Sequence, residues 1–314
     1  MKHLTRAFDG QNQWWKYLVV IIVAVIVGQI VGAIPLIVVI GVSVAMNGGQ
    51  VATPENAMDL SAYGIDPNLG LALMVIPFIV MLVLAIVLIK AFHQRTSKDV
   101  VNGGRSFRWN RFGLGVAVWG GIMLVLFFTQ LLISPEDLEF RFDPAAFIPL
   151  VFVAVLLIPI QSGTEEFIFR GYLAQGVAGW TKRVWAAILI PSVLFALMHA
   201  ANPEVKEHGF WMMMPSYFVF GVAFAITAVL DDGIELAIGI HAVNNTLGAL
   251  LVTSKESAIQ VPSLFFQQET DPVNDAVVLV VSSVIMLIIL KVILKWDFSI
   301  LAKKIKAPMV VDEA

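Results

Sequence analysis

Residues 17–46 read YLVVIIVAVIVGQIVGAIPLIVVIGVSVAM and contain no charged side chain. A helix of about 20 apolar residues is long enough to cross the roughly 30 Å hydrocarbon core of a bilayer. This run is longer than that, and Gly28, Gly32 and Pro35 are expected to tilt or kink the helix until it fits. The stretch therefore predicts a first transmembrane helix.

Further apolar runs follow along the chain, and most of them approach the same spanning length. Hydrophobic residues make up 59% of the 314 residues and charged residues only 14%, whereas soluble domains average about 25% charged residues. This composition excludes a soluble globule and predicts an all-α polytopic transmembrane helical bundle of about eight spans. The further runs cover residues 69–89, 112–133, 144–164, 184–198, 210–230, 236–253 and 276–290.

The basic residues predict the orientation, because Lys and Arg prefer short loops on the cytoplasmic side of the membrane. With the amino terminus inside, all but three of the 20 basic residues fall in cytoplasmic segments, down to Lys306 in the tail. The exceptions are Arg141, Lys206 and Lys255. We therefore expect both termini to be cytoplasmic.

The chain reads as one membrane domain, because no loop is large enough to fold separately. It divides into supporting spans (residues 1–143), a segment that holds most of the unusual polar residues (144–253), and a last span with a basic tail (254–314). Cysteine is absent, which excludes disulfides, thiol nucleophiles and thiolate metal sites. The net charge of −3 gives no indication of a nucleic-acid partner.

Polar side chains recur at one-turn spacing in three of the apolar runs. An ionisable group inside hydrocarbon costs roughly 2.5 kcal/mol or more, so such residues usually mark chemistry or transport. A single His or Asn in a span is often only a helix-packing group, but three clusters together predict a site. The clusters are Glu165-Glu166-Phe-Ile-Phe-Arg170, Phe195-Ala-Leu-Met-His199 and His241-Ala-Val-Asn-Asn245.

The first cluster lies in a helix that we expect to continue past Arg170 to Trp180, since apolar residues persist there. A rise of about 1.5 Å per residue then puts the three clusters at compatible depths. Residues four apart share a helix face, so Glu166 faces Arg170 and is expected to form an ion pair with it. Glu165 is turned away from this pair and is free to work in a cavity.

In the third cluster, His241 and Asn245 share a face, whereas Asn244 is turned from it and is expected to be a helix-packing amide. In the second cluster, Phe195 stands one turn before His199 and is expected to pack beside the site.

The chemistry of these groups allows two interpretations. A carboxylate beside a histidine in a dry cleft can activate water, and a second histidine with an amide can support a developing oxyanion. Alternatively, Glu165, His199 and His241 could be three ligands of a Zn²⁺ ion that keeps an open water position. Both interpretations point to hydrolysis of a peptide bond, with zinc or with no metal.

Other polar residues have simpler explanations. Asp231, Asp232 and Glu235 form a short inner turn and are expected to be interfacial or to cap a helix. His3 and His93 lie in terminal or loop positions, and the sequence offers no partner for either.

The three clusters resemble the CPBP family, the CAAX proteases and bacteriocin-processing enzymes also called the Abi family. Its pattern is Glu-Glu-x-x-x-Arg, then Phe-x-x-x-His, then His-x-x-x-Asn, and this chain carries all three in order within roughly residues 145–251. The resemblance implies an all-helical intramembrane protease with residues 144–253 as its catalytic core. It implies that Glu165 and His199 activate the water, that His241 and Asn245 support the oxyanion, and that Glu166 and Arg170 assist or hold the site.

We therefore expect a glutamate-type or metallo-type endopeptidase that acts on a membrane-associated peptide, such as a prenylated CAAX-like or bacteriocin-like peptide. Its partners would be membrane lipids and the peptide, and its location a multi-pass position in a prokaryotic cytoplasmic membrane. Two alternatives stay open: a non-proteolytic immunity or binding protein of the same fold, and a proton-coupled transporter in which buried Glu and His relay protons.

Overall fold

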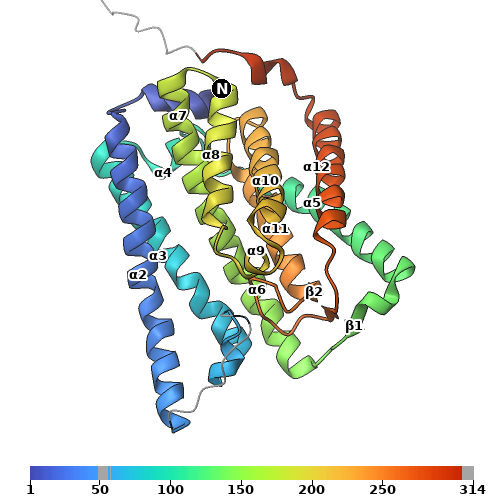
Figure 1. Ribbon diagram of the computed structural model, residues 1–314. Helices are drawn as coiled ribbons and strands as arrows, with labels where there is room; N and C mark the ends of the chain where they lie inside the picture. The colour runs from blue at the N-terminus through green and yellow to red at the C-terminus, as the bar shows by residue number, and fades with distance from the viewer. Residues whose placement is uncertain (49–55, 57, 306–314) are drawn as a thin grey trace, which may run out of the picture.

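The computed structural model describes residues 1–48, 56 and 58–305, so Lys306 of the predicted basic tail lies outside the described residues. The chain forms a bundle of long helices, drawn as ribbons in Figure 1. The helices are α1 (Lys2–Thr5), α2 (Trp14–Met46), α3 (Pro67–His93), α4 (Ser97–Asn102), α5 (Trp109–Ile133), α6 (Pro144–Glu166), α7 (Ala174–Thr181), α8 (Val184–Met198), α9 (Pro203–His208), α10 (Phe210–Leu230), α11 (Glu235–Leu251) and α12 (Pro272–Leu294).

Shorter elements connect these helices. A π-helical segment, Phe167–Leu173, joins α6 to α7, so the fourth apolar run continues past Arg170 as expected. In the part of the chain that the structure describes, four 3-10 turns cover Arg6–Phe8, Leu60–Tyr63, Pro135–Asp137 and Phe298–Ala302. A small sheet has the order β1 (Leu138–Phe140), β3 (Phe265–Gln267), β2 (Val252–Thr253), with β1 antiparallel and β2 parallel to β3.

Each of the eight apolar runs forms a helix, which confirms the all-α bundle. In the described chain, α2, α3, α5, α10, α12 and the continuous stretch Pro144–Thr181 are long and apolar enough to cross a membrane. The helix α8 has only 15 residues and α11 has 17. The number of eight crossings therefore stays a prediction.

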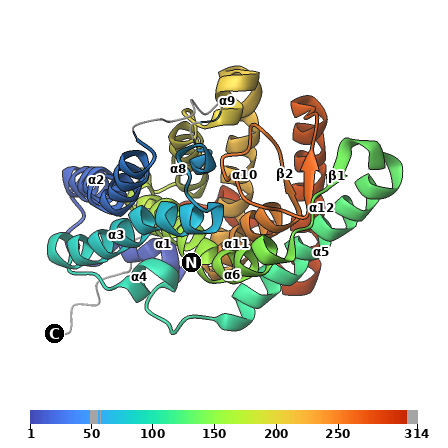
Figure 2. The same ribbon diagram turned by 90° about the horizontal axis from the view of Figure 1, so that it is seen from below.

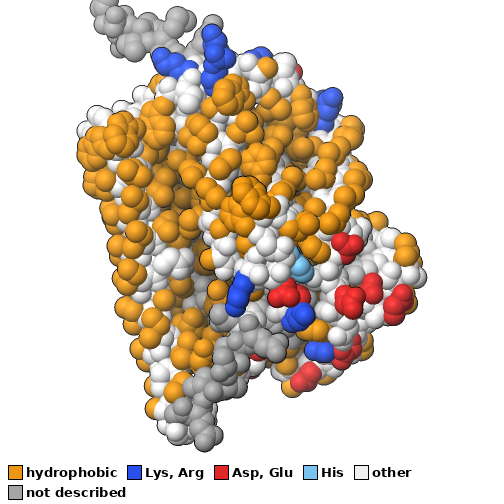
Figure 3. Space-filling model, in the orientation of Figure 1, with side chains coloured by type: hydrophobic (Ala, Val, Ile, Leu, Met, Phe, Trp, Pro, Cys, Tyr) orange, Lys and Arg blue, Asp and Glu red, His pale blue; other side chains and the backbone are white. Residues whose placement is uncertain are grey.

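The polar clusters lie on the helices in the middle of the bundle. Figure 2 shows α6, α8, α10 and α11 between the pair α2 and α3 on one side and the pair α5 and α12 on the other. The largest buried apolar group includes Phe195, Phe224 and Ile240 from these middle helices. The flank seen in Figure 3 is mostly hydrophobic, and its charged side chains gather toward the two ends, as expected for a protein surrounded by lipid.

The two ends of the described chain meet at one end of the bundle. The backbone N–H of Ile305 donates to the carbonyl of Lys182 at 3.0 Å, and Leu4, Val184 and Ile305 share one buried apolar group. The small sheet lies at the opposite end (Figure 1). This arrangement agrees with the expectation that both termini lie on the same side of the membrane. The assignment of that side to the cytoplasm stays a prediction.

The acidic turn between α10 and α11 is held by arginines that precede or begin α5. Asp231 pairs with Arg108 and Arg111 at 3.0 and 3.1 Å, and Arg108 also pairs with Glu235 at 2.6 Å. The expectation of helix capping is wrong for α11, because its N-cap is Ile234 and no side chain caps it. The carboxylates form ion pairs because the chain before α5 brings guanidinium groups to them.

His3 and His93 have partners that the sequence does not reveal. The backbone N–H of His3 donates a hydrogen bond to Asp232 at 2.9 Å. The His3 ring forms a hydrogen bond with the carbonyl of Val100 at 3.0 Å. The ring of His93 bonds to the carbonyl of Gln11 and to the hydroxyl of Tyr172, each at 2.6 Å. Both side chains are buried.

We expect acid to destabilise the protein through His3. Burial lowers the pKa of His3 from 6.5 to about 4, so the folded protein binds this proton more weakly than the unfolded chain does. The stabilisation is fully present above pH 6.5 and is lost as the pH falls toward 4. It amounts to about 3 kcal/mol at 1.36 kcal/mol per pKa unit.

Denaturant unfolding at pH 7 and pH 4.5 measures this loss. The His3→Gln variant can keep a donor to Val100 without titrating, and it should lose less stability between the two pH values than the wild type. His208→Gln is the matched control, because His208 is only half-buried and bonds to Thr270 near the surface. Equal losses in wild type and His3→Gln would contradict the prediction.

A close crossing of α5 and α11 sets the position of the third polar cluster. A Cβ added to Gly239 would collide with the carbonyl oxygen of Phe112, and one added to Gly115 would collide with that of Leu236. Because backbone atoms cannot rotate away, glycine is needed here for the two helices to touch.

We therefore expect Gly239→Ala to lower the free energy of unfolding by about 1–3 kcal/mol, the usual effect of overpacking. The matched control is Gly121→Ala on α5, where an added Cβ meets nothing within 4 Å. There the better helix propensity of alanine should raise stability by up to about 1 kcal/mol. Denaturant titration in detergent measures both variants, and equal effects would contradict the explanation.

Candidate active site

Glu165 lies in the last turn of α6, and its side chain is only 12% exposed. Its Oε1 accepts a hydrogen bond at 2.6 Å from the amide of Gln161, one turn earlier. Among the residues that the structure describes, its Oε2 has no hydrogen-bond partner, and this oxygen lies 3.7 Å from Nε2 of His241. Glu165 is therefore a largely buried carboxylate with one oxygen free beside an imidazole.

Glu166 binds two cationic or polar partners through a single oxygen. Its Oε1 accepts from the guanidinium of Arg170 at 2.9 Å and from Nδ1 of His241 at 2.8 Å. The predicted ion pair with Arg170 is confirmed, and the bond to His241 is an addition from the tertiary structure. Because Nδ1 donates to Glu166, the ring is fixed in orientation with Nε2 toward Glu165.

Arg170 is buried completely and is held by several segments. Its guanidinium lies 4.1 Å from the centre of the Phe195 ring on α8 and donates to the carbonyl of Gly221 on α10 at 3.3 Å. A cation over an aromatic face is stabilised by the ring quadrupole. The pair of Glu166 and Arg170 thus connects α6, α8, α10 and α11.

The π-helical segment Phe167–Leu173 carries Arg170 directly after the two glutamates. Such widened turns are rare and often occur at functional sites. Gly171 lies in this segment, where an added Cβ would come within 2.7 Å of the Val100 side chain on α4. The segment is therefore pressed against α4, which helps to fix the backbone beside the glutamates.

His199 is the first residue beyond α8, and its ring lies among aromatic neighbours. Its Nδ1 bonds to the carbonyl of Phe195 at 2.8 Å. The ring centre of Phe195 is 4.6 Å from that of His199 and 6.0 Å from that of His241. The expected packing of Phe195 beside the site is confirmed, and this ring contacts both imidazoles.

Asn245 joins the site through Gln161 and makes no contact of its own with the glutamates in the described hydrogen-bond network. Its amide donates to the side-chain oxygen of Gln161 at 3.1 Å. Asn244 accepts from the indole of Trp119 on α5 at 3.0 Å. The expectation that Asn244 is a helix-packing amide is confirmed.

The structure also tests the geometry of the zinc alternative. A zinc ion needs its ligand atoms about 2 Å away, all around one point. Within the described ranges, no group of three His, Cys, Asp or Glu side chains comes together in this way. Glu165, His199 and His241 in this arrangement therefore do not fit a shared zinc ion.

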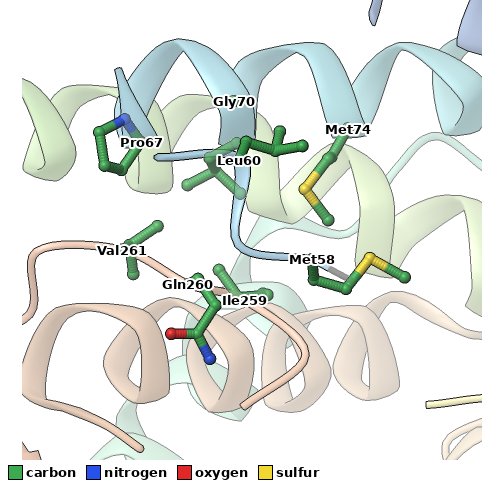
Figure 4. Close-up of a pocket in the computed structure, with 9 residues that line it drawn as sticks. Met58, Leu60, Pro67, Gly70, Met74, Ile259, Gln260 and Val261 are labelled. Atoms are coloured by element: carbon green, nitrogen blue, oxygen red, sulfur yellow. The ribbon is translucent and has the colours of Figure 1, made fainter. Parts of the chain in front are cut away.

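Two hollows lie away from these residues. One, of only about 10 Å³, lies among Leu60, Gly70 and Val261 and their neighbours (Figure 4), and it holds at most about one water. The other, of about 590 Å³, is an apolar groove between α5 and α12. Neither is lined by Glu165, His199 or His241.

Three site neighbours are absent from the sequence-based prediction. Gln161 bonds to both Glu165 and Asn245; its position one turn before Glu165 was a signal for it. Phe224 and Tyr217, both on α10, stack on His241 and His199 with ring centres 5.0 and 4.4 Å apart. Neither aromatic residue could be found from spacing, because α10 carries many similar side chains.

Comparisons with known proteins agree with this arrangement. The family described as type II CAAX prenyl endopeptidase Rce1-like matches residues 144–247. The chain is 27% identical over 279 residues to the protein called "Uncharacterized protein YyaK" of Bacillus subtilis strain 168, which covers 88% of this chain and 91% of that protein. No solved structure matches the chain significantly. The matched segment contains all three polar clusters, and the match supports the resemblance of this segment to the CPBP family of CAAX-type endopeptidases.

Proposed function

We propose that this protein is an endopeptidase that hydrolyses one peptide bond of a membrane-associated peptide with a water activated by Glu165 and His199. The observation that carries the proposal is the free Oε2 of Glu165, which is buried in an apolar helix bundle and lies 3.7 Å from His241. Among the described residues this oxygen has no hydrogen-bond partner, and a buried carboxylate oxygen without one is costly to keep, so a functional role best explains it.

In the proposed reaction, a water donates a hydrogen bond to Oε2 of Glu165 and attacks the peptide carbonyl as Glu165 takes its proton. His199 can assist, because an Nδ1–H that donates to the carbonyl of Phe195 leaves the ring's lone pair on Nε2. The carbonyl oxygen becomes an oxyanion, which a protonated His241 and the amide of Asn245 stabilise. The intermediate collapses, the C–N bond breaks, and the leaving amine takes the proton from Glu165.

The proposal extends to the setting of the reaction. The catalytic core comprises residues 144–253, with supporting spans before it and a last span and basic tail after it. The protein crosses a prokaryotic cytoplasmic membrane about eight times with both termini inside, and its partners are lipids and the peptide. Prenylated CAAX-like and bacteriocin-like peptides are the substrates to test first.

A cleavage assay tests the proposal. The purified protein in detergent is incubated with a library of membrane peptides that includes prenylated tails, and mass spectrometry follows the products with and without a chelator. We expect new peptide ends from a single bond, unchanged by the chelator. Cleavage that a chelator stops and zinc restores would show that the reaction needs zinc and would contradict direct activation of the water by Glu165. Failure of the folded protein to cut any peptide would contradict the protease assignment.

A further inference from the structure

His199 occupies a position that needs support from outside its own helix. It lies beyond Met198, the last residue of α8, in the turn that leads to α9. Among the residues that the structure describes, its one ring hydrogen bond goes back to Phe195 and fixes one atom of the ring, Nδ1. A catalytic imidazole must hold its other nitrogen in place as well, because a displacement of about 1 Å can reduce a rate about 100-fold.

The second support is the ring of Tyr217 from α10. The two rings are stacked, with centres 4.4 Å apart and planes inclined by 24°. Phe195 contacts the imidazole at 4.6 Å with a different inclination, 52°. The two aromatic rings restrict the rotation of His199 about its side-chain bonds.

The hydroxyl of Tyr217 is itself anchored in the turn that follows His199. It accepts a hydrogen bond at 2.9 Å from the amide of Asn202 and donates one to Glu204. The backbone N–H of Asn202 donates to the carbonyl of His199 at 3.0 Å. The contacts therefore form a closed ring: His199 backbone, Asn202, Tyr217 hydroxyl, Tyr217 ring and His199 imidazole.

We infer that Tyr217 is a positioning residue for His199, with Asn202 and Glu204 as the anchors of its hydroxyl. The inference rests on the proposed function, in which His199 assists the attacking water. It assigns a role to a residue outside the three sequence clusters. Tyr217 acts through His199 and takes no proton from the substrate.

The kinetic test compares two substitutions at one position. Tyr217→Leu removes the stacked ring and should lower kcat about 30-fold or more with KM nearly unchanged, because substrate contacts stay. Tyr217→Phe keeps the ring and should lower kcat only about 3-fold to 10-fold. Tyr63→Phe, in the 3-10 turn Leu60–Tyr63, is the matched control and should cleave at the wild-type rate. A Tyr217→Leu enzyme with wild-type kcat would overturn the inference.

If Tyr217→Leu does not fold, Tyr217→Phe and Asn202→Ala replace it. Both remove the same hydrogen bond, so the double variant should lose no more activity than the worse single variant. Losses that multiply would overturn the inference.

A measurement that needs no cleavage separates this inference from the proposed function. The ¹⁵N spectrum of the His199 ring, identified by its loss in His199→Gln, should show one tautomer with the proton on Nδ1 in the wild type. In Tyr217→Leu, the His199 spectrum should shift toward that of a mixture of tautomers. If Tyr217→Leu does not fold, the same shift is expected in Tyr217→Phe. A shift in a protein that cleaves nothing would support the positioning role while the protease assignment fails. An unchanged spectrum would overturn the positioning role.

Discussion

The Glu165→Gln variant is expected to lose peptide cleavage by a factor of about 10²–10⁴, the usual contribution of a general base. Glutamine has nearly the shape of glutamate and can still bond to Gln161, but it cannot take a proton from water. The fold should persist, because removing a charge from a mostly buried side chain relieves a desolvation penalty. Single-turnover cleavage and the unfolding midpoint measure the two effects.

Glu136→Gln is the matched control, because Glu136 is exposed in the 3-10 turn Pro135–Asp137. It should cleave at the wild-type rate. If Glu165→Gln cleaves as fast as this control, Glu165 is not the base. If folded wild type cleaves nothing but moves ions across sealed vesicles, and Glu165→Gln stops this flux, the transporter alternative would replace the protease.

The second large effect concerns stability. The Arg170→Met variant should lower the free energy of unfolding by about 3–5 kcal/mol, because it leaves the carboxylate of Glu166 buried without its guanidinium partner. Both side chains of this pair are 0% exposed. The loss of the cation over Phe195 adds to the effect. Denaturant unfolding in detergent measures it.

Arg141→Met provides the comparison, because the pair of Arg141 with Glu139 has the same type of bond but is 47% exposed on both sides. Its loss should change stability by at most about 1 kcal/mol. A double variant, Arg170→Met with Glu166→Gln, should recover part of the stability because no unpaired carboxylate is left. Equal effects of Arg170→Met and Arg141→Met would contradict the prediction.

Local helical geometry was enough to predict the contacts within one helix. The pairing of Glu166 with Arg170 follows from two side chains that lie four residues apart on one helix. The convergence of His241 on Glu165 and Glu166 could not be predicted from local helical geometry, because it depends on how α11 packs against α6. Spacing restricts depth along a helix axis, but it does not give the rotation of one helix toward another.

The contacts made by the connecting turns could not be predicted from the sequence either. The buried partners of His3, the arginines around Asp231 and the anchoring of Tyr217 by Asn202 all join residues from different segments. Each contact depends on where a turn folds back, and the polar residues of a turn look alike in sequence. The catalytic roles of Glu165, His199, His241 and Asn245 stay predictions until cleavage is measured.

The sequence by itself determined that this protein is an all-helical membrane bundle with three polar clusters on its apolar helices, because apolar run length and one-turn spacing are local properties of the chain. The tertiary structure decided that Glu166 orients His241, that Phe195 packs against both histidines, and that Tyr217 stacks on His199. These contacts depend on helix rotation and close backbone crossings, as at Gly239, which arise only when the whole bundle packs.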